Sequence, residues 1–321
     1  MSVSPSGVAI RLLAVLCLFA GANPALAEVQ PQHWLDRMAV AVQSTSYEGT
    51  VIRIKDGSAE ALKIVHTVKD GVIREKVVAQ EGDGLEIIRI GNEVHCILPD
   101  RKSVLVEEWN NQSSLFSTLP NSDIRFGNEY DLVFMGAERV AGREAIRIAI
   151  RPHDAFRYAH QIWLDTETGF PLQTQLISEG IAIEQVKFAE IALNHEIHAS
   201  ALEPSYSTKD FTWLQQTSGH AGTNIETTWV SDELPAGFKA VSTHEEIMSG
   251  TDEVVTHILF SDGLANVSVF IAANSGELAS GPARVGGSNS FSVERGEFEI
   301  TAIGEVPAIT VKQIATTMRP L

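Results

Sequence analysis

The chain has 321 residues, a formal net charge of −17 at pH 7 and a hydrophobic content of 44%. This hydrophobic content is enough to form real cores, so a wholly disordered chain is excluded. The acidic charge argues against a nucleic-acid partner, because nucleic-acid binding depends on Lys and Arg side chains that neutralise phosphates. It also gives no long-range attraction to anionic lipid, and it favours encounters with a basic protein surface.

Residues 1–27 contain the three parts of a secretory signal peptide. Arg11 precedes an apolar run over residues 12–20, and a small-x-small cleavage site over 25–27 lies ahead of Glu28. The run is shorter than the roughly 20 apolar residues that span a bilayer. A buried N-terminal helix is the alternative. We expect a mature chain that begins at Glu28 and works outside the cytoplasm.

Cys96 is the one cysteine that remains after residue 27, because Cys17 lies inside the signal. One cysteine cannot form an internal disulfide. Cys96 lies in an apolar run, which favours a buried packing role over a reactive thiol.

An amphipathic helix is predicted over residues 33–43, because Trp34, Leu35 and Met38 fall on one face. A long run of strands follows, with Asp-Gly and Gly-Asn turn signals between them. Repeated hairpins without intervening helices indicate an antiparallel meander. Residues 103–130 interrupt it, with a short helix or an irregular segment over 113–119. The strands are expected over residues 47–55, 61–69, 72–80, 85–90, 93–98, 130–135, 144–151, 160–165, 171–177 and 183–191.

The predicted fold class is therefore α+β: a large curved antiparallel sheet wrapped around the helix or closed upon it, plus a smaller second domain. The first domain spans residues 28–202. Residues 203–227 are rich in Ser, Thr and Gly and indicate a linker. Residues 228–321 form the smaller α+β domain, and helix and strand compete over 309–318. Its strands are expected over residues 254–260, 265–272, 290–295 and 298–303.

No catalytic sequence motif is present: the chain lacks a GxSxG elbow, a Walker loop, GxGxxG, HExxH and an EF-hand loop. His195 and His198 form the densest histidine pair, and a solvated turn is favoured over a metal site because no third His or Cys is near in sequence. His153-Asp154 and His160 similarly favour a strand-end loop over an acid–base pair. We predict no enzyme, no metal and no cofactor. A secreted hydrolase remains an alternative, since triads are spatial and a sequence can hide one.

Binding surfaces are the remaining candidates. A curved sheet that holds a helix can leave an apolar cavity for lipids or acyl chains, although a fully packed core is the favoured alternative. The candidate lining residues of such a lipid cavity are Trp34, Met38, Tyr47, Ile88 and Trp163. The candidate contacts with the other domain or with a partner, all within the linker, are Phe211, Trp213 and Leu214.

Many short segments, none of them diagnostic alone, occur together in a characteristic order and spacing. They are WLDRM (34–38), YEGTV (47–51), GVIRE (71–75), IIR (87–89), YDL (130–132), RVAGR (139–143), RPHD (151–154), WLD (163–165), TGFPL (168–172), LPAGF (234–238), SDGLA (261–265) and GEVP (304–307). In this order the chain resembles the RseB/MucB family of periplasmic regulators of the sigma-E (AlgU) envelope-stress response. The resemblance implies a large N-terminal half-barrel similar to lipoprotein-carrier folds, enclosing helices, and a small C-terminal domain.

The resemblance also implies a binding protein located in the periplasm. Members of the family bind the periplasmic segment of a membrane-spanning, inner-membrane anti-sigma factor of the RseA/MucA type and shield it from a site-1 protease, which restrains sigma-E. Lipid-like signals, lipopolysaccharide in particular, are thought to release them. The expected partners are thus that anti-sigma factor and a lipid, with no nucleic acid, and a homo-oligomer is left open. The alternative is a periplasmic lipid or lipoprotein carrier, although a simple carrier has no evident use for the second domain.

Overall fold

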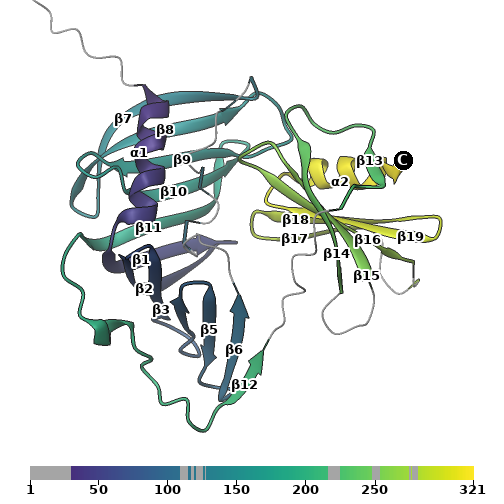
Figure 1. The fold of residues 1–321 in the computed structure, drawn as a ribbon. Helices are drawn as coiled ribbons and strands as arrows, with labels where there is room; N and C mark the ends of the chain where they lie inside the picture. Colours follow the sequence, from purple (N-terminus) through teal and green to yellow (C-terminus); the bar gives the residue numbers. More distant parts are fainter. Residues whose placement is uncertain are drawn as a thin grey trace, which may run out of the picture.

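The computed structural model describes residues 30–108, 115–116, 119–120, 126, 128–215, 225–247, 254–274, 276 and 281–321. The predicted signal peptide and most of the segment 113–119 lie outside these residues. Two domains, each built on a sheet, lie beside each other (Figure 1). Within the described part of the chain, neither helix has the length and apolar content needed to cross a membrane.

The described part of the N-terminal domain contains the α-helix α1 (Pro31–Ser44) and a 12-stranded sheet in the order β12-β6-β5-β4-β3-β2-β1-β11-β10-β9-β8-β7. The predicted antiparallel meander is confirmed. Strand β1 joins its two halves, because it pairs with β2 on one side and with β11 on the other. The strands are β1 (Tyr47–Lys55), β2 (Ser58–Lys69), β3 (Val72–Ala79), β4 (Glu86–Ile90), β5 (Glu93–Leu98), β6 (Ser103–Glu108), β7 (Tyr130–Val140), β8 (Arg143–Pro152), β9 (Ala159–Asp165), β10 (Pro171–Ser178), β11 (Ile181–Leu193) and β12 (Thr212–Gln215).

The helix lies across one face of this curved sheet, as predicted (Figure 1). Leu35 and Met38 are buried against residues of β8 and β9, which explains the apolar stripe seen in the sequence. A bulge between Thr50 and Val51 in β1 adds local bend to the sheet. Gly49 precedes the bulge, and any Cβ there would collide with the carbonyl oxygen of Glu190 in β11. Glycine at position 49 therefore lets β1 and β11 approach closely beside the bulge.

In the N-terminal domain, two stretches differ from the prediction. The meander does not stop before residue 103, because β6 adds a further antiparallel strand with Val104 fully buried. The short 3₁₀ helix η1 (Ala199–Leu202) leads into residues 203–215, which we call the strap. The strap is docked on the N-terminal domain and ends in β12, a strand parallel to β6 that the sequence did not predict. Lys76 Nζ donates to the Glu203 carbonyl at 2.6 Å, which fixes its start.

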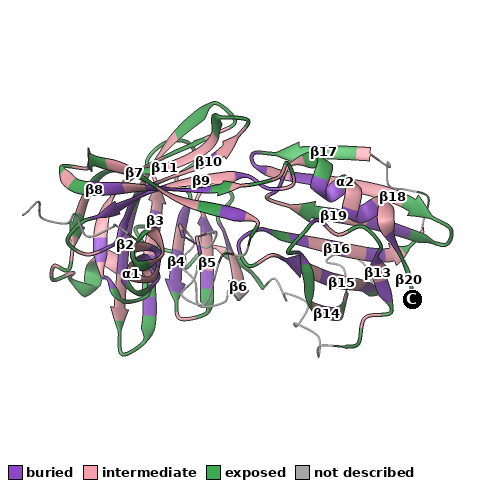
Figure 2. Ribbon diagram, turned by 90° about the horizontal axis from the view of Figure 1, so that it is seen from above, coloured by how far each residue is buried: buried purple, intermediate pink, exposed green. Residues whose placement is uncertain are grey.

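The C-terminal domain has a six-stranded antiparallel sheet in the order β14-β15-β16-β19-β18-β17. Helix prevails over strand in the contested segment 309–318, because Val311, Ile314 and Ala315 are fully buried against the sheet as one helical face. Figure 2 shows this buried face of α2 meeting the strands, with exposed residues along β17. The elements are β13 (Trp229–Ser231), β14 (Lys239–Ile247), β15 (Val254–Ser261), β16 (Asn266–Ala273), β17 (Gly281–Val285), β18 (Ser288–Arg295), β19 (Phe298–Gly304), α2 (Ala308–Thr317) and β20 (Met318–Pro320).

Candidate functional site

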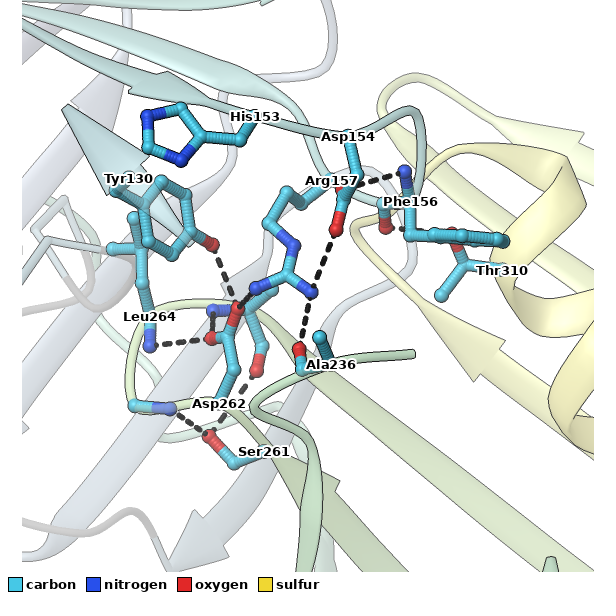
Figure 3. Close-up of polar contacts among 12 residues, drawn as sticks. Tyr130, His153, Asp154, Phe156, Arg157, Ala236, Ser261, Asp262, Leu264 and Thr310 are labelled. Carbon is cyan, nitrogen blue, oxygen red and sulfur yellow. Dashed lines mark hydrogen bonds and ion pairs between the residues drawn. The ribbon is translucent and has the colours of Figure 1, made fainter. Parts of the chain in front are cut away.

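A buried ion pair joins the two domains. Arg157, in the loop between β8 and β9, places Nη1 2.7 Å from Oδ2 of Asp262, in the turn between β15 and β16. The two side chains are 0% and 1% exposed. The hydroxyl of Tyr130, at the start of β7, donates to the same Asp262 oxygen at 2.8 Å. Figure 3 shows the three side chains converging from both domains.

The second terminal nitrogen and the faces of the Arg157 guanidinium also have partners, whereas its buried Nε has no hydrogen-bond partner among the described residues. Its Nη2 donates to the carbonyl of Ala236 at 2.5 Å and lies 3.1 Å from a carboxylate oxygen of Asp154. The guanidinium packs over the rings of Tyr130 and Phe238, at 5.3 and 5.1 Å from their centroids. A buried cation is stable only when such partners replace water. The contacts therefore hold the domains in one relative orientation.

Asp262 is held by its own turn. Its other carboxylate oxygen, Oδ1, accepts from the backbone N–H groups of Leu264 and Ala265 at 2.9 and 2.7 Å (Figure 3). Gly263 supplies the positive φ of 102° that this Asp-Gly turn requires. The hydrogen bonds within the turn thus hold the carboxylate where it meets Arg157.

The junction shifts the pKa values of two neighbouring groups. Burial, together with the carboxylate of Asp262, raises the pKa of Tyr130 far above its ordinary value, so this hydroxyl stays protonated and keeps donating. Burial lowers the pKa of His160 to about 4, and the charge of Asp262 only partly opposes this. His160 is therefore neutral at pH 7 and adds no second cation beside Arg157.

A second junction contact lies at the turn between β17 and β18. The N–H of Gly286 donates to Asp56 Oδ2 at 2.9 Å, and the N–H of Gly287 donates to Glu184 Oε1 at 2.6 Å. Gly286 has a φ of 62°, and a Cβ on Gly287 would lie 2.7 Å from Leu176. Burial and the charge of Glu184 raise the pKa of nearby Glu305 to about 7. The paired glycines let two backbone donors approach carboxylates of the other domain.

The five candidate cavity residues lie in three different clusters. Tyr47 and Trp163 share one core cluster, and Met38 lies in a second with the half-buried Trp34 against it. Ile88 belongs to a third cluster, between β4, β5 and β6. All except Trp34 are buried. The structure therefore does not bring the five together around one space.

A pocket of about 200 Å³ opens instead on β1–β4, and none of the five lines it. Arg53 and Glu60 form an ion pair that belongs to its lining. The alternation of apolar residues along β1, β2 and β3 was a sequence signal for this face, whereas the aromatic residues singled out above fill the core. The apolar lining consists of Val51, Leu62, Ile64, Val77, Ala79, Leu85, Ile87 and Leu115.

The three strap candidates divide into one packed and two exposed residues. Phe211 packs against the cluster of Ile88 and its neighbours on the N-terminal domain. Trp213 and Leu214 are 50% and 52% exposed on β12, although the ring of His95 contacts Trp213 edge-on with centroids 5.3 Å apart. Among the described residues, β12 is an edge strand of the 12-stranded sheet. Trp213 and Leu214 thus form an exposed apolar pair on a sheet edge.

The histidines weighed from sequence are not assembled into one site. His195 pairs with Glu48 at 3.1 Å, and His198 contacts Ser200 at 2.8 Å. His153 pairs with Asp131, and the hydrogen bonds that its ring donates to that carboxylate and to the Asn128 carbonyl raise its pKa. The sequence analysis missed a cluster of His244, Glu246 and His257 in the C-terminal sheet. The His-x-Glu spacing in β14 was the available signal, because it places both side chains on one face.

Arg157 and Asp262 were also missed as individual residues. They are 105 positions apart, so no local pattern connects them. Four segments that carry the family resemblance nevertheless meet here: YDL supplies Tyr130, RPHD supplies Asp154, LPAGF supplies Ala236 and Phe238, and SDGLA supplies Asp262. Part of the pattern that carries the resemblance therefore lies at the junction.

The chain is similar to known proteins over most of its length. "Sigma factor AlgU regulatory protein MucB" of Pseudomonas aeruginosa is 29% identical over 309 residues, which are 93% of this chain and 94% of that protein. "Sigma-E factor regulatory protein RseB" of Escherichia coli K12 is 27% identical and is covered to 89%, as is this chain. The crystal structure of MucB in complex with MucA(peri) superposes with a TM-score of 0.68 at 26% identity, covering 91% of this chain and 99% of that one.

Two family models match the chain, one for each domain. The model for the MucB/RseB N-terminal domain matches residues 30–206. The model for the MucB/RseB C-terminal domain matches residues 223–319. Both domains, in this order, are those expected from the resemblance, and the chain belongs to the MucB/RseB family.

Proposed function

We propose that this chain is a periplasmic negative regulator that binds the periplasmic segment of a membrane-spanning anti-sigma factor of the RseA/MucA type. Binding shields the segment from regulated proteolysis and thereby restrains sigma-E. The observation that carries the proposal is the likeness over both domains to MucB solved in complex with MucA(peri). Residues 1–27 direct export in this proposal, and residues 28–202, 203–227 and 228–321 are the first domain, the linker and the second domain.

The junction supports a role in binding. Side chains of both domains are locked together through the buried pair Arg157–Asp262, so a partner that touches both domains meets a preformed surface. Binding to a preformed surface avoids the cost of ordering it. The net charge of −17 adds attraction to a basic partner segment. The protein acts in this proposal through binding and not through catalysis.

Trp213 and Leu214 are the proposed partner contacts on the strap. Exposed apolar side chains beside the outer edge of a sheet suit an extended peptide, which can add as a strand and place alternate side chains against them. Their exposed fractions of 50% and 52% leave both side chains available. Phe211 is packed on the N-terminal domain and anchors the strap in this arrangement.

Lipid is the proposed release signal, and the pocket on β1–β4 is its proposed site in place of the five core residues. The pocket is lined mainly by aliphatic side chains, with the Arg53–Glu60 pair as its polar part. A lipid releases the partner only if it binds the free protein better than the complex, and the two ligands then weaken each other by the same factor. The lipid carrier remains the second candidate function because this same pocket would serve it.

The test is a titration of residues 28–321 into the periplasmic segment of the anti-sigma factor from the same organism, with and without lipid A. We expect tight binding that lipid A weakens, and protection of the segment from its protease. Tight binding that ignores lipid A would retain the regulator and remove the lipid switch. Lipid binding without binding to the segment would overturn the regulator in favour of the carrier.

A further inference from the structure

Three side chains with metal-binding atoms gather on one face of the C-terminal sheet. His244 and Glu246 belong to the edge strand β14, and His257 belongs to the neighbouring strand β15. Ile258, the residue after His257, packs in the core with residues of α2. Since successive side chains of a strand point to opposite faces, the cluster lies on the face that α2 does not cover.

The strand register creates this cluster. His244 and His257 are direct cross-strand partners, and Glu246 lies two residues further along β14 on the same face. Side chains at paired positions start about 4.5–5.5 Å apart at Cβ, close enough for both to reach one point. The ring of His257 is further held by stacking on Phe270, with centroids 4.4 Å apart and an angle of 18° between the planes. Rigid elements therefore present all three groups.

The distances between the three donor atoms suit a metal ion. Nδ1 of His257 lies 3.2 Å from Nε2 of His244, and Oε2 of Glu246 lies 3.4 Å from His244 Nε2 and 3.8 Å from His257 Nδ1. Tetrahedral ligands at the usual 2.0–2.1 Å from zinc are about 3.3 Å apart. The three atoms thus surround one point at distances close to those of a tetrahedral site.

The chemistry of the three groups also suits zinc. Two imidazoles and one carboxylate form a donor set that zinc uses when a fourth position stays open. The side chains are 14%, 24% and 17% exposed, so that position is reachable from solvent.

We propose that His244, Glu246 and His257 form a binding site for a divalent transition-metal ion, with zinc as the expected occupant. The ion would tie the edge strand β14 to β15 and leave one coordination position for water or for a side chain of a partner. This proposal is independent of anti-sigma-factor binding, and nothing in it depends on the junction or on the strap.

The test is calorimetric titration of Zn²⁺ into chelator-treated residues 28–321, followed by Co²⁺ absorption spectroscopy. We expect one equivalent of Zn²⁺ and the visible bands of four-coordinate Co²⁺. His244→Gln and His257→Gln should each lower the affinity at least tenfold, and Glu246→Gln should lower it less. His198→Gln, which changes an exposed histidine of the N-terminal domain, is the matched control and should leave the affinity unchanged.

Thermal unfolding keeps the proposal falsifiable if a variant is less stable. Zinc should raise the Tm of the wild-type protein and should leave the Tm of the H244Q/H257Q double variant where it was, because a ligand that binds only the folded state stabilises it by mass action. Absence of saturable zinc binding to the wild type would overturn the site. Equal zinc affinity of the folded double variant would do the same, because the ion would then be bound elsewhere.

Discussion

The junction at Arg157 and the strap over residues 203–215 contribute differently to the connection between the domains. The junction joins them through buried side chains, whereas the strap is the part of the covalent connection that lies on the N-terminal domain. The junction has two charged side chains that are 0% and 1% exposed and surrounded by polar partners. The strap runs over the surface of one domain and keeps Trp213 and Leu214 about half exposed. A break in the junction leaves a buried charge without its partner, whereas a break in the strap mainly returns groups to water. Relative domain orientation therefore depends on the junction more than on the covalent linker.

The largest expected effect is the loss of the buried pair. Asp262→Ala should lower the free energy of unfolding by about 3–5 kcal/mol, because it leaves the Arg157 guanidinium buried without its main counter-charge. Chemical denaturation monitored by circular dichroism measures this. Asp232→Ala, which removes an exposed carboxylate paired with Arg319, is the control and should cost much less. Equal stability of the two variants would contradict the central role given to the junction.

Release of the strap should cause the second-largest loss in the free energy of unfolding. Glu86 is 0% exposed and accepts from the N–H and hydroxyl of Ser205 while pairing with Lys76. Glu86→Ala should cost about 1.5–3 kcal/mol, the usual range for hydrogen bonds to a charged group. It should also speed proteolytic cleavage within 203–215. Glu203→Ala is the control, since Lys76 contacts only the backbone carbonyl there, and faster cleavage in that variant would rule out the proposed anchoring.

A pH dependence should mark the second junction contact. The pKa of Glu305 is raised from 4.5 to about 7, so the folded protein binds more protons at this group than the unfolded chain between these values. Its contribution to stability is fully present below about pH 4.5 and is lost as the pH rises through about 7. Glu305→Gln should flatten this part of the stability profile and the exposed Glu297→Gln should not, as denaturation between pH 4 and 8 can check. A wild-type slope retained in Glu305→Gln would refute the assignment.

The smallest effect on stability belongs to the exposed pair on the strap. Trp213→Ala should change the free energy of unfolding by less than about 1 kcal/mol, because the side chain is half exposed. It should nevertheless weaken binding of the anti-sigma segment at least tenfold, as aromatic contacts at an interface often do. Calorimetric titration measures this, with Val241→Ala on the exposed part of β14 as the control. Unchanged affinity would remove the strap from the proposed interface.

Local signals explain which parts of the fold were predictable. The strands over 47–55 and 93–98 were predicted with their observed bounds, since turn residues stand at their ends and each pairs with the strand that follows it in the chain. The strand β12 has four residues and pairs with β6 from more than a hundred positions away. No local preference encodes such a pairing. The helical state of 308–317 likewise depends on the sheet that buries one of its faces.

The candidate sites were less predictable for the same reason. Tyr47 and Trp163 were candidates as apolar residues of the first domain, but such side chains also fill a core, and both are buried there. The Arg157–Asp262 pair has two ordinary charged residues whose importance arises only when distant loops meet. The sequence contained the family pattern that builds the junction without indicating which charges face each other.

The separation of Arg157 and Asp262 also sets an order of events during folding. The two residues are 105 positions apart, and the ion pair cannot form until the turn between β15 and β16 exists. A chain that emerges from its N-terminus completes the first domain while Arg157 is still solvated, because domains generally fold as units in the order of synthesis. Formation of the Arg157–Asp262 pair is then a late, non-local step that removes water from the Arg157 guanidinium. Arg157 of the first domain thus gains its counter-charge only when the turn at Asp262 in the second domain has folded correctly.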